Sequence, residues 1–278
     1  MNRRLRSLPS GWYPGSASEC NREIDEFLVG FNTPAGAWIG GVAPHAGWYY
    51  SGRAAAKVIS TIAGSSNPDR VVIYGGHLSV GCEPIAYTED AWETPLGDQP
   101  MDSSFCGELV SSGEAVAAYG GFSDNTVEIQ LPFVKRFFPD IPVIAVHSPS
   151  SDGAVRLGEA VHGLLAKRGL TAIYLGSSDL THYGPNYGFA PQGTGISAVK
   201  WVKEENDRSL IEKAVAMDAR GLIQGARTLH NTCSAGPIAS VIASVSLRGV
   251  KSGSLLEYYT SYDIAPNSSF VGYAAIVY

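Results

Sequence analysis

The sequence predicts an α/β fold, specifically a layered sandwich with a mostly parallel central sheet and helices on both faces. Short apolar segments typical of buried strands alternate with segments whose apolar residues recur at helical spacing. Hydrophobic residues make up 45% and charged residues 17% of the 278 residues, a balance that allows a sizeable core. Strands that alternate with helices favour parallel pairing, because each crossover helix packs on a face of the sheet.

Six segments have the apolar and β-branched composition of strands. They are residues 37–43, 71–74, 141–147, 171–175, 255–262 and 270–278. The last two are expected to form an antiparallel pair at one edge of the sheet.

Helical spacing of apolar residues begins after Ser18 and recurs in later segments. These segments are residues 54–62, 155–165, 210–215 and 238–247, and a further amphipathic helix is expected to begin at Asp124 or Asn125. The stretch GPNYGFAPQGTG, residues 184–195, holds four glycines and two prolines and predicts a loop, either a lid or a plain surface connection. No internal repeat or low-complexity linker divides the chain, so we expect a single domain over residues 1–278.

Charge and cysteine content exclude several classes of protein. The net charge of −6 argues against nucleic acid or an anionic membrane as the main partner. No run approaches the ~18 apolar residues of a membrane span, and the basic start with Arg3, Arg4 and Arg6 lacks the apolar core of a signal peptide. Four cysteines in a chain of this length do not form a disulfide framework. We therefore expect a cytoplasmic protein.

Three histidines follow predicted strands. His45 lies in GVAPHAGWYY, His77 follows VVIYGG, and His182 follows AIYLGSSDL. Because ligand sites in open α/β sheets form at the carboxyl ends of parallel strands, these imidazoles are expected to converge at one edge of the sheet.

Each of these histidines also has a structural interpretation. His45 could cap a helix that begins near Ser51, and His77 could be a surface histidine in a glycine turn. Asp179 precedes His182 by three residues. This carboxylate either fixes the tautomer of an imidazole base or merely pins a loop.

Cys233 opens a probable helix, where the helix dipole favours a thiolate. A thiolate beside two imidazoles would form a three-ligand metal site with open positions. The alternative is that Cys233 is a small buried apolar residue.

Glu128, in DNTVEIQLPF, belongs to a first helical turn, where acidic residues are common. A structural role for Glu128 is therefore at least as well supported as a role in a functional site. The sequence contains no P-loop, no G-x-G-x-x-G after a strand and no G-x-S-x-G elbow.

Several motifs in one order resemble the Memo family, of the type found as protein B of the AmmeMemoRadiSam system. They are SGWYPGS, VAPHAGWYYSG, VVIYGGHLS, WETPLGDQPMD, DNTVEIQLPF, LGSSDLTHYG, HNTCSAGPIASVI and SFVGYAAIVY. The resemblance covers nearly the whole chain and implies a fold similar to that of class III extradiol dioxygenases.

The resemblance implies that His45, His77 and Cys233 surround a metal ion, and that His182 and Asp179 form an acid–base pair facing the same pocket. Further residues are expected around this pocket, namely Asn125, Glu128, Ser178 and His230. The family usually has G-P-S-H where this chain has Gly75-Gly76-His77, and glycine where it has Ser234. It also usually has Glu-His-Ser at Asp124-Asn125-Thr126. A histidine is therefore missing, and asparagine cannot replace it as a base at neutral pH.

The function that the resemblance implies is a mononuclear non-haem iron oxidoreductase, similar to a dioxygenase, acting on a small phenolic substrate. Fe(II) is the expected metal, with Zn or Cu as alternatives because a thiolate is a soft donor. Two further interpretations remain: a non-catalytic metal- or peptide-binding protein, or one component of a radical-SAM-associated modification system. The expected partners are a small-molecule or peptide ligand and other proteins, with oligomer formation left open, but neither nucleic acid nor a membrane.

Overall fold

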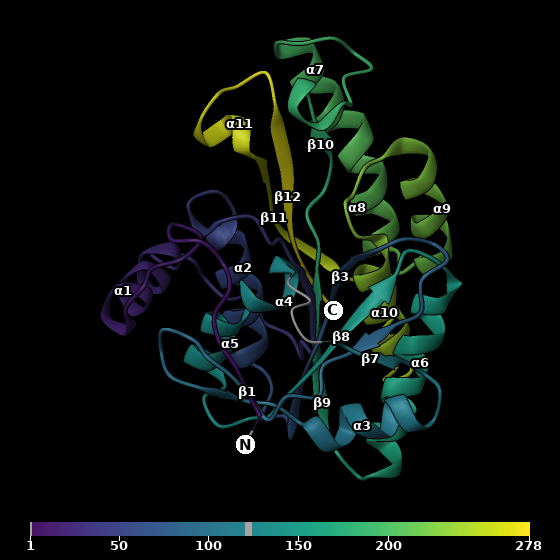
Figure 1. Cartoon of the computed structure of the whole chain (residues 1–278). Helices are drawn as coiled ribbons and strands as arrows, with labels where there is room; N and C mark the ends of the chain where they lie inside the picture. The colour runs from purple at the N-terminus through teal and green to yellow at the C-terminus, as the bar shows by residue number, and fades with distance from the viewer. Residues whose placement is uncertain (1, 120–123) are drawn as a thin grey trace.

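The computed structural model describes residues 2–119 and 124–278 and shows an α/β sandwich around one large mixed sheet (Figure 1). Within these residues the sheet has nine strands. They are β2 (Gly40–Ala43), β3 (Arg70–Leu78), β4 (Ile85–Ala86), β7 (Val116–Ala117), β8 (Val143–Pro149), β9 (Ala172–Ser177), β10 (His182–Tyr183), β11 (Ser254–Thr260) and β12 (Phe270–Val277). A separate small sheet joins β1 (Arg3–Arg4), β5 (Ala91–Trp92) and β6 (Gln99–Pro100).

The strand order in the large sheet is β10-β12-β2-β9-β3-β8-β4-β7, with β11 paired to β12. The central strands β2, β9, β3 and β8 are parallel to one another. Strand β12 pairs antiparallel with β2, β10 and β11, and β4 pairs antiparallel with β8. The predicted α/β class and the terminal antiparallel pair are confirmed, in a mixed sheet with a parallel centre.

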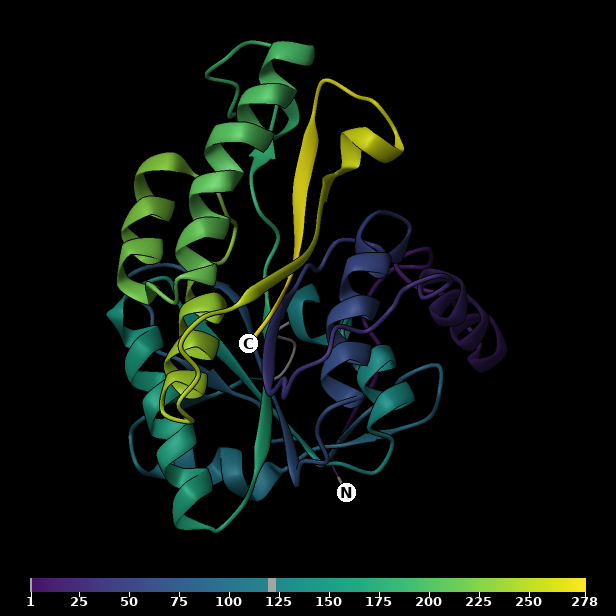
Figure 2. The ribbon, with the colours of Figure 1, turned by 180° about the vertical axis from the view of Figure 1, so that it is seen from behind.

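Helices cover both faces of the sheet. One face carries α1 (Ala17–Phe27), α2 (Trp48–Ala63), α4 (Asn125–Glu128) and α5 (Leu131–Phe137), and the other carries α3 (Ser103–Ser111), α6 (Asp152–Lys167), α9 (Ala219–Leu229) and α10 (Ala235–Ser246). Beyond the sheet, α7 (Ile196–Trp201) continues through a π-helical segment (Val202–Asn206) into α8 (Asp207–Val215). Figure 2 shows this green helical arm beside the yellow hairpin that bears α11 (Ser261–Ile264).

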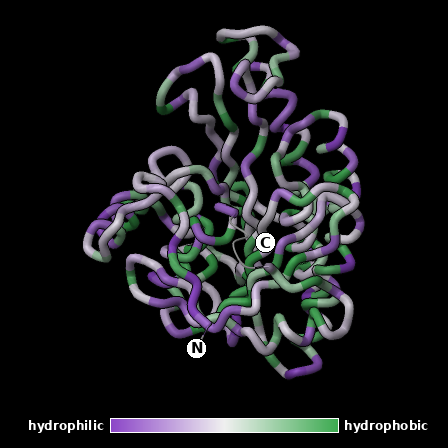
Figure 3. Tube along the Cα trace, viewed as in Figure 1, coloured by the Kyte–Doolittle hydropathy of each residue, from purple (hydrophilic) through white to green (hydrophobic). Residues whose placement is uncertain are grey.

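The core consists of two apolar layers separated by the sheet. Along β3, Val71 and Ile73 belong to the layer under α2 and α5, whereas Val72 and Tyr74 belong to the layer under α6 and α10. This alternation is the two-residue period of a strand buried on both faces. Figure 3 accordingly shows hydrophobic segments at the centre of the molecule and hydrophilic ones on the outer helices.

Side-chain caps set the start of several helices. Ser16, Asp102, Ser151 and Asp218 each accept a hydrogen bond from a backbone N–H in the first turn of α1, α3, α6 and α9. Helix α2 begins at Trp48 after Gly47, earlier than expected, so His45 does not cap it. The segment 184–195 is irregular as predicted, apart from one 3₁₀ turn over Pro185–Tyr187. No helix in the described part of the chain has the length and hydropathy needed to cross a membrane.

Candidate metal centre

The candidate site lies at the carboxyl ends of β2, β3 and β9, which are adjacent in the sheet. His45 follows β2 by two residues, His77 lies near the end of β3, and Asp179 follows β9 by two residues. Cys233 lies in the connection between α9 and α10. The topology therefore brings residues far apart in the sequence to one edge, as the positions of the histidines predict.

His45, His77 and Cys233 place three donor atoms within 4.8 Å of one another. His45 Nε2 lies 3.2 Å from His77 Nε2 and 3.2 Å from Cys233 Sγ. His45 is buried, Cys233 is half-buried and His77 is exposed. Two imidazole nitrogens and a sulfur at these separations form a donor set that could hold one metal ion.

His45 is held from three directions. Its Nδ1 lies 3.2 Å from Ser177 Oγ, its backbone N–H donates to Asp179 Oδ1 at 2.7 Å, and its carbonyl accepts from Asn125 Nδ2 at 2.9 Å. These contacts direct Nε2 toward His77 and Cys233. Burial would lower the pKa of His45, but the nearby Cys233 thiolate and Asp179 carboxylate outweigh it and raise the pKa.

Asp124 orients His77. Its Oδ2 lies 2.9 Å from His77 Nδ1, while its Oδ1 accepts from the backbone N–H of Thr126 at the start of α4. Burial disfavours the charged carboxylate, but His77 above all, then His147 and Thr126, hold the pKa of Asp124 well below its usual range. An imidazole whose other nitrogen binds a carboxylate is a better metal donor. From the sequence, Asp124 was expected only at the start of a helix, because its contact with His77 joins residues 47 positions apart and has no local signal.

Cys233 lies two residues before α10, whose capping residue is Ser234, and so stands at the start of a helix, as the sequence predicts. Its backbone N–H donates to the Asp179 carbonyl at 3.3 Å. Burial would raise the pKa of the thiol, but His45, His182 and His77 together lower it well below its ordinary value. The thiolate that a metal would bind is therefore favoured by the neighbouring imidazoles.

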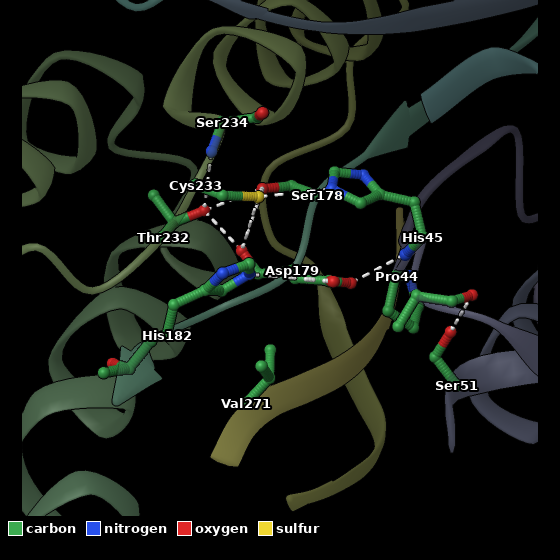
Figure 4. A network of polar contacts seen from close by, with 12 residues as sticks. Pro44, His45, Ser51, Ser178, Asp179, His182, Thr232, Cys233, Ser234 and Val271 are labelled. Carbon is green, nitrogen blue, oxygen red and sulfur yellow. Dashed lines mark hydrogen bonds and ion pairs between the residues drawn. The ribbon is translucent and has the colours of Figure 1, made fainter. Parts of the chain in front are cut away.

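His182 and Asp179 lie beside the donor set (Figure 4). His182 Nε2 is 3.8 Å from Asp179 Oδ2 and is buried with no hydrogen-bond partner among the described residues. Burial would lower its pKa, but Asp179 and Cys233 raise it to about 10. The Asp179 carbonyl also accepts from Thr232 Oγ1 at 2.7 Å. Asp179 therefore both faces the imidazole and holds the loop that carries Cys233.

Two cavities adjoin this cluster. The larger, about 580 Å³, is lined by His45, His77, Asp179 and His182 together with residues from α2, the loop after β10 and the β11–β12 connection. The smaller, about 440 Å³, shares His182 and Tyr187 with the larger and is also lined by Phe189, His230 and Cys233. A small organic molecule fits a space of this size beside the donor atoms.

The other expected pocket residues have different positions. Asn125 lines the larger cavity and His230 the smaller one. Ser178 is buried beside the site, with its hydroxyl 2.7 Å from Thr232 Oγ1. Glu128, also expected around the pocket, lines neither cavity.

Glu128 instead anchors the N-terminal segment. Its buried carboxylate accepts hydrogen bonds from the backbone N–H groups of Ser7 and Leu8 and from the hydroxyls of Ser7 and Tyr13. The neighbouring Trp12 lines the larger cavity, and its carbonyl accepts from Trp48 N–H at 2.8 Å. Glu128 thus contributes to the site through the position of the segment that forms one wall.

A buried polar cluster that sequence analysis missed supports the strand of His182. Asp207 is fully buried and accepts from the backbone N–H of Thr181 at 3.0 Å, from the Thr181 hydroxyl and from the Tyr258 hydroxyl at 2.8 Å. Asn206 Nδ2 donates to Thr181 Oγ1 at 2.9 Å, and Asn231 Nδ2 donates to the Asn206 carbonyl at 3.1 Å. The cluster therefore connects the strand of His182 to the loop of Cys233.

Comparison with known proteins places these features in a family context. A family model described as Memo-like protein matches residues 4–277. A MEMO1 family protein of Methanopyrus kandleri is 33% identical over 251 residues, which cover 86% of this chain and 82% of the relative. Another from Methanosarcina acetivorans is 30% identical, over 100% of this chain and 99% of the relative.

Among solved structures, an uncharacterized protein from Escherichia coli K12 has a similar fold. The TM-score is 0.50 at 11% sequence identity, and the match covers 80% of this chain and 91% of that protein. This likeness concerns the fold alone.

Proposed function

The chain belongs to the Memo-like family, and from this premise we propose that it is a mononuclear non-haem metal oxidoreductase, similar to a dioxygenase, that acts on a small phenolic substrate. The observation that carries the proposal is the convergence of His45, His77 and Cys233 donor atoms within 4.8 Å beside a cavity of about 580 Å³. Donors that come from three separate chain segments and leave space on one side suit a metal that also binds a substrate.

The donor set fits Fe(II) in number and in chemistry. His45 and His77 supply borderline nitrogen donors, and Cys233 supplies a charge-bearing thiolate in place of the carboxylate of a two-histidine, one-carboxylate site. When bound, Fe(II) would supply reactivity toward O₂ and Lewis acidity toward a phenol hydroxyl.

His182 is the proposed base. The His182 side chain lines the larger cavity, and its Nε2 has no hydrogen-bond partner among the described residues, so this nitrogen is available for the proton of a substrate hydroxyl. Asp179 stabilises the imidazolium that results, from 3.8 Å. The free thiolate of Cys233 contributes to the His182 pKa of about 10. A metal ion held by Cys233 would neutralise the thiolate and so would lower the pKa of His182 toward the range in which an imidazole accepts protons at neutral pH.

A second function, metal handling without oxidation, is favoured by one specific feature. Cys233 is a soft donor that borders the smaller cavity, and a thiolate with two imidazoles also suits Zn²⁺ or Cu(I). Under this alternative, the protein would bind one of these ions and would consume no O₂.

The test begins with elemental analysis of protein prepared without air. We expect about one iron per chain in the wild type and in His162→Ala, whose imidazole contacts the Tyr174 hydroxyl and belongs neither to the donor set nor to the two cavities. We expect loss of iron in His45→Ala. Oxygen uptake is then measured with a panel of phenols and catechols. His182→Ala should retain iron but lose activity by about 10²–10⁴-fold. Stoichiometric zinc or copper without oxygen uptake would favour metal handling instead, and no bound metal would refute both functions.

A further inference from the structure

Strand β3 is irregular where it reaches the candidate centre. Its pairing with β8 shifts register between Gly75 and Leu78. Gly76 and His77 lie in this interval and together stand opposite a single residue of β8. Two residues against one form a β-bulge, which bends a strand and turns a side chain away from the regular alternation. The direction of the donor His77 therefore depends on how the backbone of this bulge is held.

Two hydroxyl groups hold Gly76 from both sides. The Thr126 hydroxyl accepts from the Gly76 backbone N–H, with nitrogen and oxygen 2.7 Å apart. The Ser234 hydroxyl donates to the Gly76 carbonyl, with the two oxygens 3.0 Å apart. Thr126 and Ser234 are both fully buried. Because these two backbone groups belong to the two peptide planes that flank Gly76, the hydroxyls fix both planes.

Gly76 also packs closely against the residues around it. Its φ is +91°, in the region that favours glycine. A β-carbon at this position would lie 2.5 Å from the ring of His147, which is buried on β8. The backbone of the bulge thus lies directly on a buried ring, and the ring and the two hydroxyls together leave it little space to shift.

The same two residues connect the bulge to other parts of the donor set. The Thr126 hydroxyl donates to Asp124 Oδ1, and the other oxygen of this carboxylate lies 2.9 Å from His77 Nδ1. Ser234 directly follows the donor Cys233 in the chain. Hydrogen bonds at Gly76 therefore join the start of α4, the bulge of β3 and the segment that carries Cys233.

The contacts of Thr126 form a closed ring around His77. The ring passes from the Thr126 hydroxyl to the Asp124 carboxylate, then through the His77 side chain and backbone to Gly76, and returns to the same hydroxyl. One side chain thus supports both the imidazole and the backbone that carries it. A donor held at both ends keeps its orientation more strictly than one held by a single contact.

From these contacts we propose that Thr126 and Ser234 are positioning residues of the metal centre, which together clamp Gly76 and so set the separation between the donor atoms of His77 and Cys233. The donor atoms of the site lie within 4.8 Å of one another without an ion. A site already held in this arrangement loses less freedom when the ion binds, and the saving appears as affinity. This inference rests on the proposed function only for the premise that these residues bind a metal ion.

The test measures Co²⁺ binding by the purified full-length protein, stripped of metal and kept without air. Affinity is obtained by competition with a chelator, and the absorbance of the thiolate–cobalt bond reports the geometry of the donors. Thr126→Val, which keeps the shape of the side chain without its hydroxyl, should weaken binding at least ~10-fold and alter the spectrum, and so should Ser234→Ala. Thr126→Ser retains the hydroxyl and should restore most of the affinity and the wild-type spectrum.

The double variant tests whether the two hydroxyls act as one clamp. Because both hold the same residue, the loss of affinity in the double variant should be at least ~2-fold smaller than the product of the two single losses. Ser244→Ala is the matched control, since it removes another buried hydroxyl of α10, which donates to the Gly158 carbonyl at 3.1 Å. It should lower stability in urea, as Ser234→Ala does, but leave the affinity and the spectrum unchanged.

Unchanged affinity in Thr126→Val or Ser234→Ala, or an equal loss in Ser244→Ala, would overturn the proposal. So would losses that simply multiply in the double variant, Thr126→Ser as weak as Thr126→Val, or wild-type protein that binds no Co²⁺. The proposed function is tested separately, by iron content and oxygen uptake. Protein whose Co²⁺ affinity depends on both hydroxyls but which consumes no O₂ would support the clamp and refute the oxidoreductase.

Discussion

The stability of the Asp207→Asn variant, measured relative to that of the wild type, should increase as the pH rises. Asp207 is fully buried beneath the strand of His182, where Thr181 and Tyr258 donate hydrogen bonds to it. Burial raises its pKa from the ordinary 3.8 to about 6, and those hydrogen bonds only partly oppose the rise. The carboxyl is therefore easier to ionise in the unfolded chain than in the folded protein.

The sign and size of the effect follow from these two pKa values. Because the folded state binds the proton more tightly, folding stability falls as the pH rises from about 4 through about 6. The full difference corresponds to about 3 kcal/mol. About 2 kcal/mol of it falls between about pH 4.5 and pH 8, where the unfolded carboxyl is already mostly ionised.

The assay is urea denaturation of wild type and Asp207→Asn at several pH values in that interval. Asparagine carries no charge at any of them, and its carbonyl oxygen can still accept from Thr181. The stability of the variant minus that of the wild type should increase by about 2 kcal/mol from about pH 4.5 to pH 8. Titrating groups that do not interact with Asp207 contribute equally to both proteins and cancel in the difference; His182, whose charge favours the ionised Asp207, is the neighbour that does interact.

Asp102→Asn provides the matched control. Asp102 is also buried, but Arg70 Nε lies 2.6 Å from its carboxylate, and this ion pair overcomes burial and lowers its pKa. Its contribution is lost only as the pH falls through that low pKa, so the difference from wild type should stay nearly constant above about pH 4.5. A constant difference for Asp207→Asn as well, or one that decreases with pH, would refute the argument that burial dominates at Asp207.

Three further predictions concern the site and its supports. Cys233→Ala should lower metal affinity at least ~10-fold, measured by competition with a chelator, whereas Cys82→Ala at an exposed cysteine should not; equal affinities would remove Cys233 from the donor set. Asp124→Asn should weaken metal binding by about 10–100-fold through the loss of the carboxylate on His77 Nδ1, and unchanged affinity would show that this contact does not tune the donor. Glu128→Ala should lower the free energy of unfolding in urea by about 2–3 kcal/mol, because it leaves buried donors without an acceptor. It should also speed proteolysis near the N-terminus, and an unaltered digestion pattern would contradict the anchoring role.

The parts of the fold that the sequence predicted are those with a local signal. The six predicted strands correspond to β2, β3, β8, β9, β11 and β12. The signal is plainest in β3, β8 and β9, because apolar runs buried on both faces are recognised without knowledge of their neighbours. Helices α3 and α9 were missed, since glycines interrupt them and few of their residues are buried. Their capping residues, Asp102 and Asp218, were the local signals available.

In the candidate site, too, only features with a local signal could be predicted from the sequence. Histidines placed just after strands predicted a common edge, and the structure brings His45 and His77 together there. The roles of Glu128 and Asp207 could not be predicted, because they depend on contacts between segments far apart in the chain. Glu128 binds Ser7, 121 residues away, and Asp207 binds Thr181 across 26 residues. Only the folded topology determines such pairs.

Asp179 supports a metal donor and also faces the proposed base, and comparing two variants distinguishes these roles. Its Oδ1 accepts from the His45 backbone N–H at 2.7 Å and its carbonyl from Cys233 N–H at 3.3 Å, whereas its Oδ2 faces His182 at 3.8 Å. Asp179→Asn therefore weakens both the support of the donor His45 and the partner of the base, and it should reduce metal affinity and reaction rate together. His182→Ala removes only the base, so the rate should fall while the metal is retained. If both variants kept full metal affinity, the carboxylate would not hold His45 in place, and if both lost the metal, His182 would belong to the donor set itself.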